Sequence, residues 1–224
     1  MFSRHLVELL SQHADPEKAG HMEAYMKNQF SFFGIKSPER KQLFRQHWNL
    51  QPKPTYTQMQ QIVKELWKQP QRELQYCAIA TFYKFSKKLE SSTINLIEWL
   101  ITHKSWWDTV DSLHEITGLY FRNFPEKKLP TTAKWMDSGN FWLQRMCIIF
   151  QLKYKNETDH EMLENYIVRL AGEHEFFIRK AIGWALREYS YTNPEWVRDF
   201  ISKNEPKLSG LSIREGLKAL NRKK

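Results

Sequence analysis

The sequence predicts an all-α fold, and more narrowly a right-handed helical solenoid of HEAT-like helix pairs with a concave binding face. Turn-forming residues are scarce, because Gly (8) and Pro (9) together make 17 of 224 residues, below the roughly 12% of average chains. Valine, which favours strands, occurs only five times. The third observation is a segment that recurs every 34 or 35 residues.

Prolines mark the expected helix starts in order along the chain, at Pro16, Pro38, Pro70, Pro125 and Pro194. Proline suits the first turn, where its missing N–H had no helical partner. Side chains suited to capping precede three of these helices: Asp15, Ser37 and Asn193. We expect about a dozen short helices in five to six pairs. Since no Gly/Ser-rich linker divides the chain, we expect a single domain over residues 1–224.

Three segments resemble one another, residues 74–85, 143–154 and 178–189, and residues 109–120 form a weaker copy. Their first, fifth, eighth and twelfth positions are mostly apolar, which is one stripe of a helix. The twelfth position is always aromatic: Phe85, Tyr120, Tyr154 and Tyr189. One helix pair per repeat, stacked on its neighbours, explains the period.

The third position of each copy lies off the apolar stripe and holds a polar or amphipathic residue: Tyr76, Asp111, Arg145 and Lys180. In a solenoid the second helices of successive pairs line one face, usually the concave one. These four residues are therefore expected to form a row along a possible binding surface.

Several protein classes are disfavoured by the sequence. The longest apolar run, Met146–Phe150, is far shorter than the roughly 20 residues of a membrane span. The N-terminus has charged residues within its apolar stretch, unlike a secretory signal. Cys77 and Cys147 lie 70 residues apart, so a disulfide framework or zinc site is not expected and a reducing cytoplasm fits. Nucleotide-binding, serine-hydrolase and HExxH motifs are absent, and we expect no metal and no cofactor.

The densest cluster of chemically useful side chains is residues 104–111 (KSWWDTVD). On a helix, Trp106 would share the core stripe with Val110, whereas Trp107 would lie about 100° away and share a face with Asp111. This spacing allows an aromatic–carboxylate pair on a less buried face. It equally allows an ordinary helix N-terminus with Asp108 as the acid of the first turn and two packed tryptophans.

Aromatic and basic residues also share one face near the C-terminal end of the chain: Phe177, Lys180, Trp184, Arg187 and Tyr191. Such a face suits a nucleic-acid backbone, or else it is a solvated basic face with Trp184 packed on the next repeat. Arg145 stands among apolar residues and needs an anionic partner, either a phosphate or an acid such as Asp111.

The charge distribution favours nucleic acid as the partner. The net charge is +9, of which residues 174–224 contribute +5 from 11 basic and 6 acidic side chains, and the chain ends in Arg222, Lys223 and Lys224. A basic stripe with interleaved aromatic residues is typical of nucleic-acid binding, although basic ends also serve solubility alone.

At these residues the sequence resembles the AlkD-like, HEAT-repeat alkylpurine DNA glycosylases of bacterial base-excision repair. The matching stretches are residues 25–28 (YMKN), 37–40 (SPER), 104–111 (KSWWDTVD), 142–155 (WLQRMCIIFQLKYK) and 181–189 (AIGWALREY). They span nearly the whole chain in order. One departure is Met146-Cys147, where the family has two small alanines; this changes packing under Arg145 but removes no functional group.

The resemblance implies a monofunctional hydrolase that grips duplex DNA in the concave face and cleaves the N-glycosidic bond of cationic N3- or N7-alkylated purines. It implies Asp111 as the catalytic aspartate and Trp107 and Trp184 as active-site tryptophans. It further implies Arg145 as a DNA-contacting arginine and Tyr25 as an aromatic residue near the lesion, with Arg187 continuing the backbone contact. Lys180, which shares the basic face with Arg187, is a further expected DNA-binding residue. We expect a cytoplasmic monomer without membrane attachment.

The competing hypothesis is a non-catalytic helical-repeat module that binds nucleic acid or an acidic protein, because a fold alone does not determine a reaction. Asp111 distinguishes the two hypotheses. A protein that only binds the DNA backbone has no use for a carboxylate facing phosphates.

Overall fold

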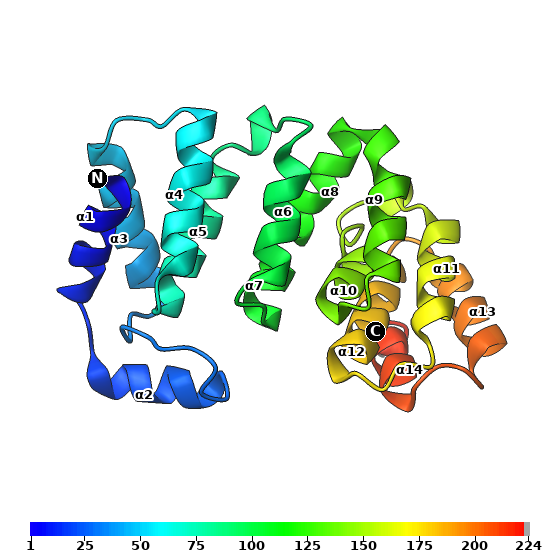
Figure 1. Cartoon of the computed structure of the whole chain (residues 1–224). Helices are drawn as coiled ribbons and strands as arrows, with labels where there is room; N and C mark the ends of the chain where they lie inside the picture. The colour runs from blue at the N-terminus through cyan, green and yellow to red at the C-terminus, as the bar shows by residue number, and fades with distance from the viewer. Residues whose placement is uncertain (222–224) are drawn as a thin grey trace. The chain divides into compact units, whose positions relative to one another are not determined.

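A computed structural model describes residues 1–221 of the chain, and over those residues every regular element is a helix (Figure 1). The all-α class expected from the sequence is therefore confirmed. The chain divides into two compact units, Met1–Glu90 and Ser91–Lys224, which are described separately below. That the two units act as a single domain stays a prediction. The basic residues 222–224 lie outside the described part.

The first unit contains five α-helices and one turn of 3-10 helix: α1 (Phe2–Ser11), α2 (Pro16–Tyr25), α3 (Ser37–Leu50), α4 (Tyr56–Lys68), α5 (Arg72–Tyr83) and η1 (Ser86–Lys88). Helices α4 and α5 lie side by side along their lengths (Figure 1). Fully buried apolar side chains such as Leu66, Trp67 and Phe82 fill the space between them, which stabilises the pair by removing apolar surface from water.

A buried carboxylate fixes the loop that follows α2. Glu73 is fully buried and accepts hydrogen bonds from the backbone N–H groups of Phe33, Gly34 and Ile35 at 2.9–3.1 Å. Gly34 has a φ of 89°, and a Cβ there would lie 2.1 Å from the carbonyl oxygen of Asp15, so only glycine fits. The acid at the start of α5 thereby satisfies three backbone donors of an irregular segment.

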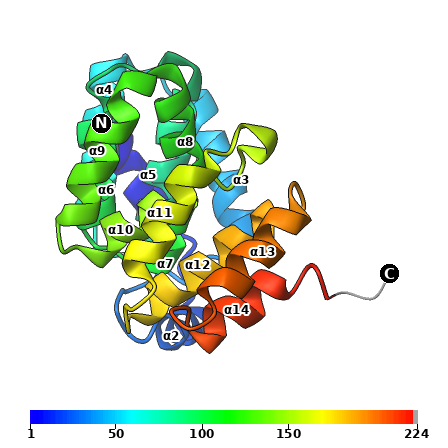
Figure 2. The same cartoon turned by 90° about the vertical axis from the view of Figure 1, so that its right-hand side faces the viewer.

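The second unit contains nine α-helices and one turn of 3-10 helix within its described residues: α6 (Thr93–Thr102), α7 (Trp107–Ser112), α8 (His114–Asn123), α9 (Pro125–Asp137), α10 (Phe141–Ile149), η2 (Lys155–Glu157), α11 (His160–Leu170), α12 (Phe176–Tyr189), α13 (Pro194–Asn204) and α14 (Gly210–Leu217). Helix α12 packs against both α10 and α14 (Figure 2). A Cβ at Gly183 would lie 2.5 Å from the Cβ of Glu215, so this glycine permits the close approach of α14.

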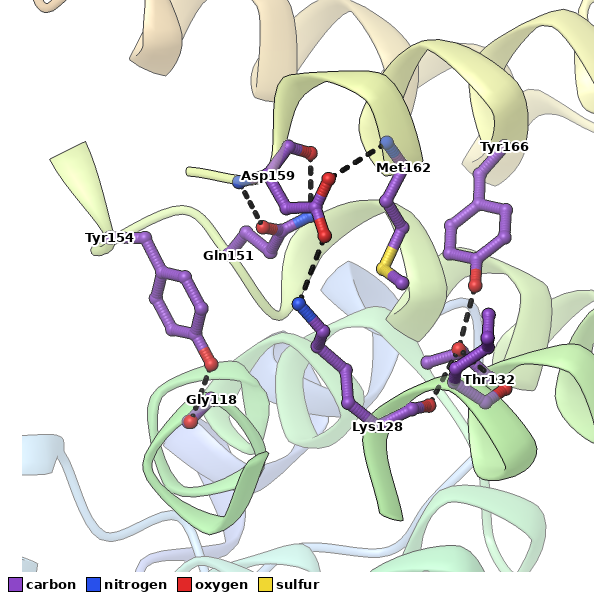
Figure 3. Close-up of polar contacts among 9 residues, drawn as sticks. Gly118, Lys128, Thr132, Gln151, Tyr154, Asp159, Met162 and Tyr166 are labelled. Carbon is purple, nitrogen blue, oxygen red and sulfur yellow. Dashed lines mark hydrogen bonds and ion pairs between the residues drawn. The ribbon is translucent and has the colours of Figure 1, made fainter. Parts of the chain in front are cut away.

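Polar contacts between residues 29 to 36 positions apart connect successive helix pairs of the second unit (Figure 3). The Tyr154 hydroxyl donates to the carbonyl oxygen of Gly118 at 2.6 Å, and the Tyr166 hydroxyl bonds to that of Thr132 at 2.6 Å. The Tyr120 hydroxyl reaches the carbonyl oxygen of Ser91 at 2.8 Å. Tyr120 and Tyr154 occupy the twelfth repeat position, so in these two copies the aromatic residue both fills the core and bonds to the preceding backbone.

The expected helix starts are confirmed in part. Asp15 caps α2 through the backbone N–H of Lys18 at 3.1 Å, and Asn193 caps α13 through that of Trp196 at 3.1 Å. The expectation for Ser37 is wrong: it is the first residue of α3, and its hydroxyl accepts from the Arg40 guanidinium instead. The helix expected at Pro70 begins at Arg72, because the backbone there first pairs with Ser31 in an isolated bridge.

None of the helices in the described part of the chain combines the length and the apolar composition that a bilayer crossing requires.

Candidate functional site

The predicted carboxylate and one predicted tryptophan lie on the short helix α7. Trp107 is its first residue and Asp111 stands in its last turn. The helix ends at Ser112, and after a single non-helical residue, Leu113, the chain continues as α8. Residues four apart on a helix share a face, and both side chains are partly exposed. The structure thus bears out the expected placement of Trp107 and Asp111 on one partly buried face.

Arg145 of α10 holds the carboxylate of Asp111 in a two-pronged ion pair. Its Nε lies 2.8 Å from Oδ1 and its second terminal nitrogen lies 2.8 Å from Oδ2. The Arg145 side chain is 4% exposed and that of Asp111 is 20% exposed. Parallel N–H···O bonds of this kind fix both distance and orientation. The carboxylate is therefore anchored from behind while part of it still faces solvent.

The same guanidinium also donates to the backbone carbonyl of Phe177 in α12. Arg145 consequently joins three helices, α7, α10 and α12, around one charge. Of the partners that the sequence left open for this arginine, the structure shows the acid Asp111. A direct contact from Arg145 to the DNA backbone stays a prediction, since Nε and both terminal nitrogens of the guanidinium donate to Asp111 and Phe177.

Trp184 stands in the middle of α12 and is partly exposed. Its ring lies 5.8 Å from the ring of His114, centroid to centroid, with an interplanar angle of 64°. His114 in turn donates from Nδ1 to the backbone carbonyl of Asp111 at 2.6 Å. Through His114, Trp184 and Asp111 belong to one connected group of side chains.

The two cations predicted to bind DNA further along α12 share an acid. Glu215 of α14 lies 3.3 Å from the Nζ of Lys180 and 2.7 Å from the guanidinium of Arg187. Burial by itself raises the pKa of Glu215, but the hydrogen bond and charge of Lys180, together with Arg187, outweigh it and hold that pKa below its ordinary value. The cluster carries a net positive charge on a partly exposed surface.

Residues at the third repeat position pair with each other between neighbouring repeats. Asp111 pairs with Arg145, and Lys180 pairs with Glu215, which lies 35 residues further on. In the first unit the Arg40 guanidinium lies over the ring of Tyr76, 36 residues away, at 4.3 Å. Sequence reasoning missed Arg40 and Glu215. Extending the 35-residue register by one repeat beyond Lys180 would have found Glu215, whereas the same step before Tyr76 leads to Lys41, the neighbour of Arg40.

His114 was also missed, and no pattern in the sequence indicates it. Its contacts depend on the interruption of the helix at Leu113, which turns the imidazole toward the end of α7. An uninterrupted helix through residues 106–120 is what the apolar stripe predicts, and the buried residues of that stripe are indeed Val110, Leu113, Thr117 and Tyr120.

Trp106 does not belong to the helical stripe as expected. It precedes α7 in an extended conformation, and its ring packs against Trp142 at 6.2 Å and Phe177 at 5.3 Å. Its structural role is nevertheless consistent with the expectation, because the ring belongs to an aromatic cluster at the beginning of α7, α10 and α12. Within residues 1–221 its buried Nε1 has no hydrogen-bond partner.

Tyr25, the predicted aromatic residue near the lesion, belongs to the first unit. It is the last residue of α2 and is 70% exposed. The chain then turns through Lys27 and Asn28, which both have positive φ values of 58° and 56°. The Phe32 N–H bonds back to Glu23 of α2 at 3.1 Å. A role for Tyr25 in the site stays a prediction.

Among residues 1–221, no three His, Cys, Asp or Glu side chains gather as a metal site would require. Cys77 and Cys147 are free and buried. Burial raises the pKa of Cys77 to about 12 and also raises the pKa of Cys147, so both thiols are held in their unreactive protonated form.

The sequence profile of a family described as DNA alkylation repair enzyme matches residues 6–220 of the chain. A similar solved structure is described as a predicted DNA alkylation repair enzyme from Enterococcus faecalis. It is 33% identical in sequence, with a TM-score of 0.86 over 94% of this chain and 98% of the other. No curated protein sequence matches the chain.

Proposed function

Because this chain belongs to the family of DNA alkylation repair enzymes, we propose that it is a monofunctional DNA glycosylase. Its substrates are N3- and N7-alkylated purines in duplex DNA, such as 3-methyladenine and 7-methylguanine, and the bond it hydrolyses is the N-glycosidic bond. It requires no cofactor and acts as a monomer. The observation that carries the proposal is the partly exposed carboxylate of Asp111, gripped at both oxygens by a buried arginine.

The chemistry of the substrate explains why one carboxylate is enough. Alkylation at N3 or N7 places a positive charge on the purine and makes it a good leaving group, so strong protonation of the base is unnecessary. The remaining tasks are to stabilise the oxocarbenium-like sugar and to position a water for attack. A fixed carboxylate performs both tasks in glycoside hydrolysis.

The bidentate pair supports this role for Asp111. A carboxylate offers about four acceptor sites, of which Arg145 uses one on each oxygen. Each oxygen therefore keeps an acceptor site for a water or for the sugar. Since Arg145 is buried on the protein side, the carboxylate does not have to reorganise as charge develops on the sugar.

The tryptophans and the basic cluster supply binding. Trp107 and Trp184 pack on the deoxyribose, and their electron-rich faces favour the positive charge that develops there. Lys180 and Arg187 contact the backbone together with Tyr25, which sets the position of the strand without reading its sequence. Arg145 supports the site from the protein interior by holding Asp111.

The direct test is to incubate the protein with methylated duplex DNA and to detect free 7-methylguanine or 3-methyladenine by mass spectrometry. Asp111→Asn should lower the single-turnover rate constant by at least about 100-fold, while affinity for duplex DNA persists. Asp137→Asn is the matched control, because it breaks another Asp–Arg pair between repeats, the exposed pair of Asp137 and Arg169.

Two results would contradict the proposal. Release of purines by Asp111→Asn at the wild-type rate would remove Asp111 from its role. Tight DNA binding by the wild-type protein without release of any alkylated base would instead favour the non-catalytic nucleic-acid-binding module.

A further inference from the structure

The break between α7 and α8 puts the carbonyl of the candidate catalytic residue at a helix end, where the Leu113 N–H is shared between it and the Val110 carbonyl. The last four carbonyl groups of an α-helix have no partner within the helix, and Asp111 stands in the last turn of α7. The His114 imidazole, in the first turn of the next helix, donates from Nδ1 to the Asp111 carbonyl at 2.6 Å. Arg145 fixes the carboxylate of Asp111, and His114 fixes its main chain.

The direction of this hydrogen bond determines which ring nitrogen of His114 carries a hydrogen. A backbone carbonyl only accepts, so Nδ1 carries a hydrogen. Nε2 is buried and has no hydrogen-bond partner within residues 1–221; the nearest charged group, the Glu115 carboxylate, lies at 3.9 Å. The bond to Asp111 is therefore what holds the imidazole in its orientation.

The same ring meets Trp184 edge to face, with centroids 5.8 Å apart. His114 is 9% exposed, so its ring is confined between the end of α7 and the tryptophan of α12. A shift of the imidazole would move both the backbone of Asp111 and the packing surface of Trp184. One buried side chain thus couples two residues of the site that lie more than 70 positions apart in the sequence.

We propose that His114 is a positioning residue for base excision: it holds Asp111 and Trp184 at the separation that the sugar requires. The inference rests on the proposed function and deepens it. His114 does not touch the substrate, and it acts on the rate through the placement of the other two residues. Small misplacements of catalytic groups are enough to slow a reaction strongly.

Two variants separate the contacts of His114. His114→Phe keeps an aromatic ring beside Trp184 and removes the donor. His114→Asn keeps a donor near the position of Nδ1 and removes the ring. The chain also offers a matched control, since His160 meets Trp196 at the same 5.8 Å with an interplanar angle of 70° but is exposed. His160→Phe tests the loss of a histidine from the same packing motif elsewhere.

The measurement is the single-turnover release of 7-methylguanine, with affinity for undamaged duplex DNA and the melting temperature determined for each variant. His114→Phe should lower the rate constant about tenfold with affinity unchanged. His114→Asn should recover most of that loss, and His160→Phe should react like the wild type. A long-range ¹H–¹⁵N spectrum of the histidines should show His114 with hydrogen on Nδ1.

If the wild-type protein releases 7-methylguanine and His114→Phe does so at the same rate, this inference is overturned and the proposed function is left intact. An equal loss in His160→Phe, or a loss that merely follows a fall in melting temperature or DNA affinity, would do the same. A wild-type protein that releases no alkylated purine would overturn the proposed function itself. A spectrum in which the Nδ1 of His114 carries no hydrogen would contradict the hydrogen bond to the Asp111 carbonyl irrespective of activity.

Discussion

Two Asp–Arg pairs in the second unit connect neighbouring helix pairs across a similar stretch of sequence, and they differ in burial. Asp111 and Arg145 are 34 residues apart, and the arginine side chain is 4% exposed. Asp137 and Arg169 are 32 residues apart, with side chains that are 68% and 44% exposed. Water screens the second pair, whereas the first is held in one geometry by its surroundings. Burial of the arginine, more than the pairing itself, holds the Asp111 carboxylate in one orientation, which the proposed catalytic role requires.

The largest expected effect follows from removing each arginine in turn. Arg145→Met should destabilise the fold by about 3 kcal/mol, because it leaves the Asp111 carboxylate and the Phe177 carbonyl without their buried partner. Arg169→Met should cost less than about 1 kcal/mol. Chemical denaturation of both variants measures the difference. Equal losses would show that burial does not distinguish the two pairs.

Glu215 extends the comparison of ion pairs to an acid that is paired with two cations, Lys180 and Arg187. Glu215→Gln should free Lys180 and Arg187 for phosphates. The slope of log affinity against log salt concentration should then steepen by about one to two. Binding to undamaged duplex DNA, titrated at several salt concentrations, measures this. An unchanged slope would mean that Glu215 does not control these cations. Either both cations contact DNA while the acid is present, or neither contacts DNA in either protein.

Glu164 provides the control for Glu215. It also accepts a Lys partner from another helix, Lys203 at 3.4 Å, but neither residue is assigned to the DNA surface. Glu164→Gln should therefore leave the salt dependence of DNA binding as it is in the wild type.

The smallest effect concerns a partly exposed pair, Lys128 and Asp159, which lie 2.9 Å apart (Figure 3). Burial alone raises the pKa of Asp159, but the hydrogen bond from Lys128 and the capping N–H of Met162 outweigh it and lower that pKa below its ordinary value. A lowered folded-state pKa stabilises the protein above the unfolded pKa near 4 and ceases to do so as pH falls through the folded value.

Asp159→Asn keeps the helix cap, because asparagine also caps well, and removes the charge. At pH 7 the variant should be less stable than the wild type by about 0.5–1 kcal/mol, and the difference should decrease as pH falls below about 4 and vanish below the lowered folded-state pKa. Melting temperatures of both proteins between pH 3 and pH 7 measure this. A difference of the same size at pH 7 and at pH 3 would contradict the assigned ion pair.

The sequence allowed much of the fold to be predicted because its signals are local and repeated. Apolar spacing places Ile178, Ala181 and Ile182 on the buried stripe of α12, and all three are buried. Helix caps such as Asp15 and Asn193 act within three residues. Ser37 is not the cap because α3 begins one residue earlier than expected, with Lys36 at the N-cap position and Ser37 already inside the helix. A sequence pattern does not fix a helix boundary to a single residue.

The candidate site was predictable as a set of residues but not as an arrangement. The repeat register placed Asp111, Arg145 and Lys180 in equivalent positions, and the structure shows that such positions are neighbours. Whether Arg145 faces a phosphate or Asp111 was open in the sequence. That choice depends on which acceptors surround a buried guanidinium, including the Phe177 carbonyl of a third helix.

The sequence by itself determined that this chain is helical, repetitive and basic, since composition and periodicity fix backbone preference and charge without reference to distant contacts. Only the tertiary structure decided that Arg145 is turned inward, that Glu215 gathers Lys180 and Arg187, and that His114 joins Asp111 to Trp184. Each of these outcomes is a competition among polar groups for partners in a confined space. Which contact forms depends on three-dimensional distances that a one-dimensional pattern does not contain.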